Sequence, residues 1–250
     1  MKIALIGYGK MGHAIELLAS QRGHQVQVAI DNVKQWSDNI DQLRLADVAV
    51  EFSTPDSAVD NIQKCFEIGL PVVVGTTGWY NQLDAVVAAC KQCAGSLFVA
   101  SNFSIGMNIM FDLNRRLAKL MSGRPQYTPS IAETHHIHKL DAPSGTAITL
   151  AQDIVGGSVQ WVETPVAVSN GSATQVRQFA APQTPLAITS YREGEIPGTH
   201  EVVYDSAEDV ITISHRAKSR QGLAMGALIA AEFLYGKKGY YTMNDLLNIE

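Results

Sequence analysis

A glycine-rich turn near the N-terminus constrains the fold of this chain more than any other feature. An apolar run over residues 2–6 leads directly into Gly7-Tyr8-Gly9-Lys10-Met11-Gly12. A helical pattern follows, and a second strand expected over residues 25–30 ends at Asp31. This order of strand, glycine-rich turn, helix, strand and terminal acid is that of a dinucleotide-binding βαβ unit. The alternative is a glycine loop that only turns the chain, with Asp31 as a solvated strand end.

The same alternation continues over the first hundred residues. Further strands are expected at residues 46–52, 71–74 and 96–100, with helices at 57–68 and 81–93. Buried strands that alternate with helices are typical of a parallel sheet covered on both faces. The sequence therefore predicts an α/β fold with an N-terminal Rossmann-type dinucleotide-binding domain.

The regular alternation of strands and helices ends after Asn102, which indicates a second domain. A long helix is expected at residues 105–121, and a helix rich in small residues at 222–235 is suited to pack back on the first domain. Between them, Gly, Pro and Asn signals separate strand-like runs at residues 159–168, 175–179, 187–192, 199–204 and 209–215. We expect an α+β domain on an open mixed sheet at residues 105–215, and a dinucleotide-binding domain made of residues 1–104 and 216–250.

Composition excludes several classes of protein. The 250 residues carry a net charge of −5, the wrong sign for a chain that binds nucleic acid by neutralising phosphates. No apolar run reaches the ~18 residues of a membrane span. The three cysteines are an odd number and cannot form a disulfide framework, so we expect a protein of a reducing compartment, the cytoplasm. Cys90 and Cys93 form a C-x-x-C, but at the end of an apolar run they are expected to be buried helix residues rather than a redox or metal pair.

Three segments are candidates for cofactor binding. In the first turn, Gly9 lets the backbone approach a pyrophosphate at the start of a helix, and Asp31 can accept hydrogen bonds from a ribose. A carboxylate there repels a 2′-phosphate, so NAD is favoured over NADP, although Lys34 could admit NADP. Two loops that follow strands, Gly75-Thr76-Thr77-Gly78 and Ala100-Ser101-Asn102-Phe103, are expected at the nicotinamide end of the cofactor.

The densest cluster of titratable groups runs from Glu133 to Thr146. Three of the seven histidines, His135, His136 and His138, lie within four positions of one another. His135 and Lys139 are expected to share one face, where a cation beside an imidazole can donate a proton or hold an anion. A zinc site and a solvated histidine patch are the alternatives, and no metal is expected because no acidic ligand follows at helical spacing. Ser144 is a candidate N-cap, which leaves the N–H groups of Gly145 and Thr146 for a carboxylate.

Taken together, these segments closely resemble the dihydrodipicolinate reductase family. The resemblance rests on the Gly7–Gly12 turn, Gly75-Thr76-Thr77-Gly78, Asn102-Phe103-Ser104-Ile105-Gly106, Arg192-Glu193-Gly194 and the highly specific run Glu133-Thr134-His135-His136-Ile137-His138-Lys139-Leu140-Asp141-Ala142-Pro143-Ser144-Gly145-Thr146-Ala147. It extends in order over nearly the whole chain. One departure is Asn32, which stands where the family commonly has an arginine.

The resemblance implies a function and a role for each matching residue. The implied reaction transfers a hydride from NADH or NADPH to ring C4 of 4-hydroxy-tetrahydrodipicolinate, protonates the neighbouring carbon and releases the hydroxyl as water. His135 is implied as proton donor and acceptor, and Lys139 as second proton donor. The cyclic dicarboxylate is implied to bind His136, Gly145 and Thr146. The cofactor is implied to bind Gly7, Tyr8, Gly9, Lys10, Met11, Gly12, Asp31, Gly75, Thr76, Thr77, Ala100, Ser101, Asn102 and Phe103. The family also implies a homotetramer joined through sheets of the second domain.

Two other functions remain open from the residues alone. One is another two-domain NAD(P)-dependent amino-acid or semialdehyde oxidoreductase, although an acylating enzyme would need a well-placed cysteine nucleophile. The other is a dinucleotide sensor without catalysis, which would require His135, Lys139 and Thr146 to be together by accident. Oxidation of NADH or NADPH with the dicarboxylate would discriminate between them.

Overall fold

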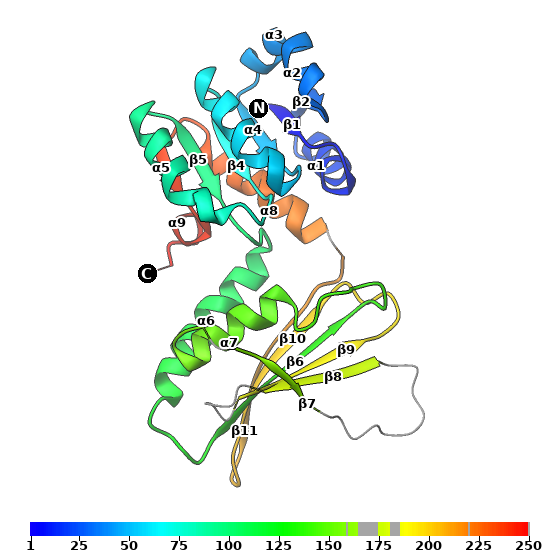
Figure 1. The fold of residues 1–250 in the computed structure, drawn as a ribbon, viewed down its shortest axis with the longest axis vertical. Helices are drawn as coiled ribbons and strands as arrows, with labels where there is room; N and C mark the ends of the chain where they lie inside the picture. The colour runs from blue at the N-terminus through cyan, green and yellow to red at the C-terminus, as the bar shows by residue number, and fades with distance from the viewer. Residues whose placement is uncertain (159, 165–174, 181–185, 220, 250) are drawn as a thin grey trace. The chain divides into compact units, whose positions relative to one another are not determined.

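The computed structural model describes residues 1–158, 160–164, 175–180, 186–219 and 221–249. The chain divides into two compact units, one of residues 1–105 with 221–250 and one of residues 106–220. Each unit is built on its own six-stranded sheet (Figure 1). The boundaries expected from the sequence lie after residues 104 and 215.

The sheet of the first unit is parallel throughout and has the strand order β12-β5-β4-β3-β1-β2. Three main helices alternate with the strands along the chain, as the sequence predicts for a Rossmann-type fold. The strands are β1 (Lys2–Ile6), β2 (Gln25–Ile30), β3 (Val48–Glu51), β4 (Val72–Val74), β5 (Ser96–Val99) and β12 (Gly239–Tyr241), and the helices are α1 (Lys10–Gln21), α4 (Pro55–Glu67) and α5 (Leu83–Gln92).

Helices bury both faces of this sheet, which explains why its central strands β1, β3 and β4 are mostly apolar. In β1, Ile3 and Leu5 belong to one core cluster, and Ala4 and Ile6 belong to another. The first cluster contains residues of α1 and of a helix near the C-terminus, and the second contains residues of α4 and α5. The successive side chains of the strand therefore supply two separate cores.

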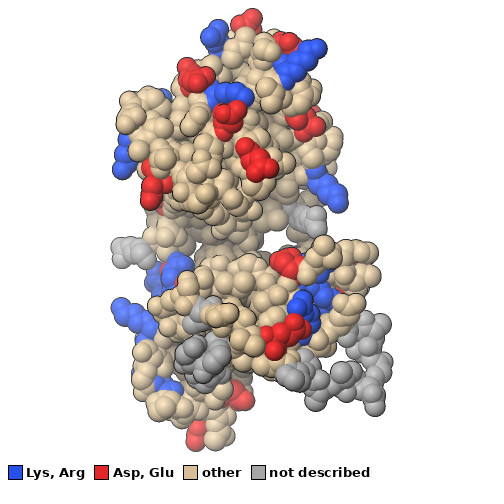
Figure 2. All heavy atoms as spheres, in the orientation of Figure 1, with Lys and Arg blue, Asp and Glu red and all other residues tan. Residues whose placement is uncertain are grey.

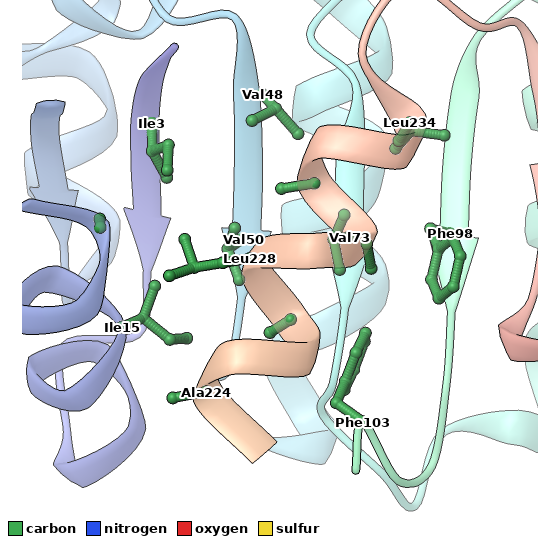
Figure 3. Packing of buried hydrophobic residues seen from close by; sticks show 14 of the residues in the cluster. Ile3, Ile15, Val48, Val50, Val73, Phe98, Phe103, Ala224, Leu228 and Leu234 are labelled. Atoms are coloured by element: carbon green, nitrogen blue, oxygen red, sulfur yellow. The ribbon is translucent and has the colours of Figure 1, made fainter. Parts of the chain in front are cut away.

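The C-terminal helix α8 (Gln221–Leu234) completes the first unit. Its buried small and apolar side chains lie against the central strands, with Leu228 beside Val50 (Figure 3). A Cβ atom at Gly226 would lie 1.7 Å from the carbonyl oxygen of Phe103, so only glycine allows this approach. Glu232 adds an ion pair to Arg22 at 2.8 Å. As predicted from the sequence, this helix packs against the core of the first unit.

Several short elements of the first unit are not predicted from the sequence. They are α2 (Val33–Asp38), α3 (Ile40–Arg44), the 3₁₀ turn η1 (Tyr80–Gln82), the edge strand β12 and α9 (Met243–Leu247). Helices α2 and α3 each bury a single side chain, Trp36 and Leu43, so they have too little apolar periodicity to be detected. Cys90 is buried in α5 as expected, but Cys93 is exposed because the helix ends at Gln92.

The second unit has a mixed sheet of order β11-β10-β6-β9-β8-β7, in which only the described pair β6 and β9 is parallel. Helices α6 (Ile105–Met121) and α7 (Gly145–Val155) supply the other side of its core, where Met110, Leu150 and Ile188 are buried together (Figure 1). The strands are β6 (Thr128–His135), β7 (Val162–Thr164), β8 (Gln175–Ala180), β9 (Ala187–Arg192), β10 (Thr199–Asp205) and β11 (Val210–Arg216).

Most strand predictions for this unit agree with the structure to within one residue at each end, as β8 to β11 show. The strand expected at residues 159–168 is described only as β7, and residues 159 and 165–168 lie outside the described residues. Strand β6 is not predicted, because Pro129, Glu133 and His135 interrupt its apolar alternation.

Charged side chains of both signs are interspersed over the face of the molecule drawn in Figure 2. In the described part of the chain, no helix is both long enough and apolar enough to cross a membrane.

Candidate active site

The glycine-rich turn packs closely against the strand next to it. Gly7 has φ +89°, and a Cβ atom there would lie 2.1 Å from the carbonyl oxygen of Phe52. Helix α1 follows with Gly9 as its N-cap, and no side-chain hydrogen bond caps the start of this helix. A Cβ at Gly9 would meet no described atom within 4 Å, so its surroundings are open. The first N–H groups of α1 can therefore bind a phosphate, as in other dinucleotide sites.

A cavity of about 460 Å³ lies beside this turn. Gly7, Gly9 and Asp31 border it, together with Asn32 and Trp36. The Oδ1 atom of Asp31 accepts a hydrogen bond from the backbone N–H of Tyr8 at 3.0 Å, which holds the carboxylate against the turn. Among the described residues that border the cavity, none is a lysine or arginine. The residues present therefore fit the adenosine end of a dinucleotide.

The other predicted cofactor residues lie at the carboxyl ends of β4 and β5, further along the same sheet edge. The hydroxyl of Thr76 accepts a hydrogen bond from Ser53 N at 2.8 Å, and Thr77 and Ser101 are exposed. Phe103 is buried and packs on Phe52, with 5.7 Å between the ring centroids. Parallel strands thus bring the three predicted loops to one edge, although only the first borders the cavity beside Asp31.

Glu51, at the end of β3, is a buried acid that the sequence analysis misses. Its side chain is completely buried, and Asn61 and Ser53 donate hydrogen bonds to it. Burial raises the pKa of this carboxyl above its usual value, even though the hydrogen bonds act in the opposite direction. Ser53 and Asn61 also border the cavity, so Glu51 supports that wall from beneath.

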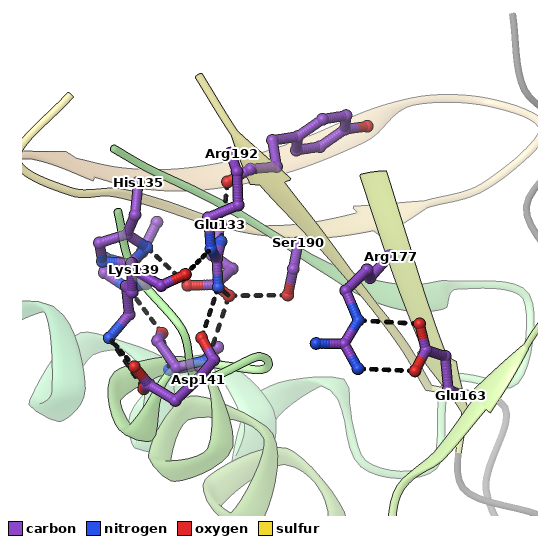
Figure 4. Close-up of polar contacts among 12 residues, drawn as sticks. Glu133, His135, Lys139, Asp141, Glu163, Arg177, Ser190 and Arg192 are labelled. Carbon is purple, nitrogen blue, oxygen red and sulfur yellow. Dashed lines mark hydrogen bonds and ion pairs between the residues drawn. The ribbon is translucent and has the colours of Figure 1, made fainter. Parts of the chain in front are cut away.

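In the second unit, strand register brings together polar side chains that are far apart in the sequence. Glu133 on β6 lies opposite Ser190 on β9 and His200 on β10, and His135 lies opposite Arg192. All five residues are buried. They occupy the sheet positions that elsewhere carry the core side chains Ile131, Ile188 and Val202. Together they form a polar cluster that continues the apolar core toward one end of the sheet. Figure 4 labels four of its members, Glu133, His135, Ser190 and Arg192.

Glu133 is the centre of this cluster. Its Oε1 atom accepts hydrogen bonds from Ser144 N at 3.0 Å, from Ser190 Oγ at 2.7 Å and from Arg192 Nη2 at 3.2 Å. Its Oε2 atom lies 2.7 Å from Nδ1 of His135. Burial alone would raise the pKa of Glu133, but the hydrogen bonds from His135, Ser144 and Ser190 outweigh it and hold that pKa well below its usual range. Glu133 is therefore an ionised carboxylate.

His200 lies against the catalytic candidate His135. Their rings form an edge-to-face pair with centroids 5.1 Å apart, and Nε2 of His200 lies 3.2 Å from Oγ of Ser144. Burial, followed by the positive charge of His135, lowers the pKa of His200 to about 4. His200 is therefore a neutral hydrogen-bonding partner at physiological pH.

Lys139 lies in a loop, which corrects one expectation from the sequence. Strand β6 ends at His135 and α7 begins at Gly145, so no strand or helix gives His135 and Lys139 a common face. The Nζ atom of Lys139 lies 2.8 Å from both carboxylate oxygens of Asp141. Burial raises the pKa of Asp141, but the hydrogen bonds from Lys139, together with its positive charge, outweigh burial and lower that pKa below its usual value. The cation is thus held by a local partner, at the edge of the cluster (Figure 4).

The start of α7 matches the expected anion site. Ser144 is its N-cap, and its hydroxyl accepts a hydrogen bond from Ala147 N at 3.2 Å, as the sequence predicts. Gly145 is exposed and Thr146 is half-buried, so the first turn is accessible. His136 is half-buried, with its ring centroid 5.9 Å from that of His138.

Four residues of the cluster receive no role in the sequence analysis, namely Glu133, Ser190, Arg192 and His200. A signal for two of them exists in β9, where Ser190 and Arg192 continue the inward alternation that Ile188 begins. A charged residue at a position that the strand period assigns to the core indicates a buried ion pair.

Glu133, His135 and His200 also place possible metal-ligand atoms within 4.8 Å of one another. The carboxylate, however, already accepts three hydrogen bonds, one of them from the cationic Arg192. Nε2 of His200 is engaged with Ser144. The donor set therefore favours an ion-paired network over a metal centre.

Comparison with known proteins gives a consistent result. Residues 1–103 match the family described as "Dihydrodipicolinate reductase, N-terminus", and residues 106–247 match "Dihydrodipicolinate reductase, C-terminus". A protein of Christiangramia forsetii named 4-hydroxy-tetrahydrodipicolinate reductase is 42% identical over 99% of this chain and 98% of its own length. One of the same name from Neisseria gonorrhoeae is 33% identical over 85% of this chain and 77% of its own. The dipicolinate-bound dihydrodipicolinate reductase of Paenisporosarcina sp. TG-14 has the same fold, with a TM-score of 0.71, 21% identity and full coverage of both chains.

Proposed function

This chain belongs to the dihydrodipicolinate reductase family, and from that premise we propose that it reduces 4-hydroxy-tetrahydrodipicolinate to tetrahydrodipicolinate with loss of water, in lysine and diaminopimelate biosynthesis. The family is one of NAD(P)H-dependent oxidoreductases. The observation that carries the proposal is the buried Glu133 carboxylate, which joins the imidazole of His135 to the start of α7. A proton-transferring group and an anion site are thus joined through one buried side chain.

In this proposal the first unit holds the cofactor. The nicotinamide supplies the hydride when it is bound. The open backbone at Gly9 and the start of α1 support a pyrophosphate site, and Asp31 supports a ribose site. Tyr8, Lys10, Met11, Gly12 and the segments 75–77 and 100–103 would complete the contacts.

The second unit would bind and protonate the substrate. Gly145 and Thr146 offer N–H groups at the positive end of α7 to one carboxylate, and His136 is proposed to contact the same ring. His135 would give and receive the proton. Lys139 would be the second proton donor, with Asp141 keeping its ammonium in place. Cationic groups beside a substrate that gains negative charge stabilise the transition state.

We propose a preference for NADH over NADPH. Asp31 borders the cavity, its lining has no cationic side chain among the described residues, and Lys34 is exposed. A 2′-phosphate would therefore approach a carboxylate without a compensating charge. Asp31→Ala should weaken the binding of NADH more than that of NADPH. The ratio of kcat/KM for NADH to kcat/KM for NADPH should fall by about tenfold. Equal weakening of both cofactors would remove Asp31 from the ribose site.

We also propose a cytoplasmic homotetramer that assembles through the second unit. The sheet face opposite to Glu133 and His135 carries Ala132, Thr134 and Tyr191 around a cavity of about 570 Å³. Further along the sheet, Val210 is 57% exposed. Light scattering should give four times the 27.0 kDa chain mass, and a monomer would contradict this assembly.

A coupled assay tests the proposed activity. The substrate is made in place by the synthase that condenses pyruvate with aspartate semialdehyde, and oxidation of NADH or NADPH is followed by absorbance. Pyridine-2,6-dicarboxylate should compete with substrate, because it presents two carboxylates on a flat ring. If neither cofactor is oxidised, the reductase assignment is wrong.

A further inference from the structure

We propose that Glu133 is the positioning residue that fixes the tautomer of His135 and that, through Arg192, it fixes the loop that carries Lys139. This inference rests on the proposed function, because it concerns how the same site is held ready for proton transfer. Neither Glu133 nor Arg192 is among the residues expected to contact substrate or cofactor. Their role is to act through His135, Lys139 and Ser144.

The tautomer follows from the contact between the two side chains. Oε2 of Glu133 lies 2.7 Å from Nδ1 of His135, and both side chains are buried. An ionised carboxylate only accepts hydrogen bonds, so this short contact favours the form of His135 with its hydrogen on Nδ1. The nitrogen that remains to gain and lose a proton is Nε2. It lies beside Gly198, where a Cβ atom would be only 3.1 Å away. A larger residue at position 198 would therefore crowd Nε2, which glycine leaves accessible.

The carboxylate keeps its charge because three donors meet its other oxygen. Ser144 N and Ser190 Oγ donate to Oε1, as does the guanidinium of Arg192. The exposed fractions are 0% for Glu133 and 4% for Arg192, so water does not screen this ion pair. A buried anion supported in this way stabilises the protonated imidazole and holds the ring in one orientation.

Arg192 extends the same ion pair to the catalytic loop. Its Nη2 atom donates to the carbonyl oxygen of Asp141 at 2.6 Å, and its Nε atom donates to that of Lys139 at 3.2 Å. Ser144, at the far end of the loop, donates its N–H to Glu133. Both ends of the segment from Lys139 to Ser144 are therefore tied to one buried pair. The planar fork of arginine holds donors on three separate nitrogen atoms, whereas a lysine donates from one nitrogen atom only.

The charged and titratable groups around His135 are few and come from each neighbouring element. Glu133 lies on the same strand, Arg192 on β9, His200 on β10 and Lys139 in the loop. His200 is neutral, so the carboxylate is the group whose removal changes the protonation of His135 most directly.

The first test needs no enzymatic activity. Nitrogen-15 NMR of the labelled protein reports which imidazole nitrogen of His135 carries the hydrogen, and a His135→Gln spectrum assigns the signal. We expect the Nδ1–H tautomer above neutral pH. A neutral ring with its hydrogen on Nε2 would overturn the proposal, whether or not the protein is a reductase.

The second test replaces the carboxylate by its neutral isostere. In Glu133→Gln the three donors that meet Oε1 require the amide oxygen at that position. The amide NH2 group then faces Nδ1 of His135 and favours the form with the hydrogen on Nε2. We expect kcat to fall about 10²-fold or more, as when a general acid is lost. The alkaline limb of the pH–rate profile should move to lower pH by about one unit or more, because the protonated ring loses its counter-charge. Glu133→Asp should recover part of kcat. NADH binding to the first unit should be unchanged in both variants.

Arg177→Lys is the matched control, because Arg177 also forms a two-bonded ion pair on this sheet. Its partner is Glu163, and both side chains are about half exposed (Figure 4). Arg177→Lys should leave kcat, KM and the pH profile unchanged, whereas Arg192→Lys should raise the KM for the dicarboxylate several-fold. If Glu133→Gln retains kcat and its pH profile while wild-type enzyme is active, Glu133 is not a positioning residue. An inactive wild type would instead refute the proposed function, and the NMR result would remain to judge this inference.

Discussion

His200 should make the second unit lose stability as the pH falls from 7.5 to 5. Its pKa is lowered from 6.5 to about 4, chiefly by burial, so the folded chain excludes a proton that the unfolded chain binds. The stabilisation is fully present above the unfolded pKa of 6.5 and is lost as the pH falls toward 4.

The size of the effect follows from this shift. Each unit of pKa difference corresponds to about 1.4 kcal/mol, which gives about 3 kcal/mol for the complete titration. At pH 5 only part of it is expressed, about 2 kcal/mol relative to pH 7.5. Glutamine at position 200 can keep a hydrogen bond to Ser144 but does not titrate. His200→Gln should therefore lose about 2 kcal/mol less than the wild type over this range.

Urea unfolding followed by circular dichroism at both pH values measures the difference, and hydrogen exchange in β10 peptides assigns it to the second unit. His138→Gln is the control, because it removes a histidine of the same unit whose side chain is 68% exposed. If His200→Gln and the wild type lose the same free energy of unfolding between pH 7.5 and 5, the argument from burial is wrong.

Three further results are expected. Gly226→Ala should lower the free energy of unfolding of the first unit by about 3 kcal/mol, because its Cβ would meet the Phe103 carbonyl oxygen at 1.7 Å. In the same helix, a Cβ atom at Gly222 would meet no described atom within 4 Å, so Gly222→Ala should be neutral or slightly stabilising in thermal unfolding. An equal loss of unfolding free energy in both variants would contradict the packing argument. Lys139→Ala should lower turnover about 10²-fold while the Kd for NADH stays the same, and a parallel loss of NADH binding would show that Lys139 has another role. Glu51→Ala should raise the Kd for NADH several-fold, because Ser53 and Asn61 in the cavity wall lose their shared acceptor, and an unchanged Kd in fluorescence titration would remove Glu51 from that wall.

The first unit was predictable from sequence because its signals are local. The turn from Gly7 to Gly12 is followed at once by its helix, and the central strands β1, β3 and β4 are mostly apolar. The short elements between β2 and β3 were missed, since α2 and α3 bury one side chain each. The edge strand β12 pairs three residues with β5, which lies more than 130 positions earlier in the sequence. Such pairing leaves no pattern within the segment itself.

In the second unit, local sequence patterns predicted only part of the candidate site. His135, Lys139 and the N-cap Ser144 were identified because they stand in one run. Glu133 belongs to that run but has a role only through Ser190, Arg192 and His200, which strand register brings beside it. Register depends on the whole sheet, and so these contacts could not be derived from spacing. The loop between β6 and α7 also escaped prediction, because its conformation depends on the buried guanidinium of Arg192.

The interrupted course of the first unit has a consequence for synthesis of the protein. Its sheet is nearly complete once residue 99 has been made, yet α8 and β12 come from residues 221–241. Until they leave the ribosome, the face that carries Val50 and Val73 lacks its covering helix. The second unit is continuous in sequence, so it can finish folding while the first still waits with an uncovered apolar face. A nascent chain of this protein is therefore most in need of a chaperone between the synthesis of residue 99 and that of residues 221–241, and the first unit matures after the second.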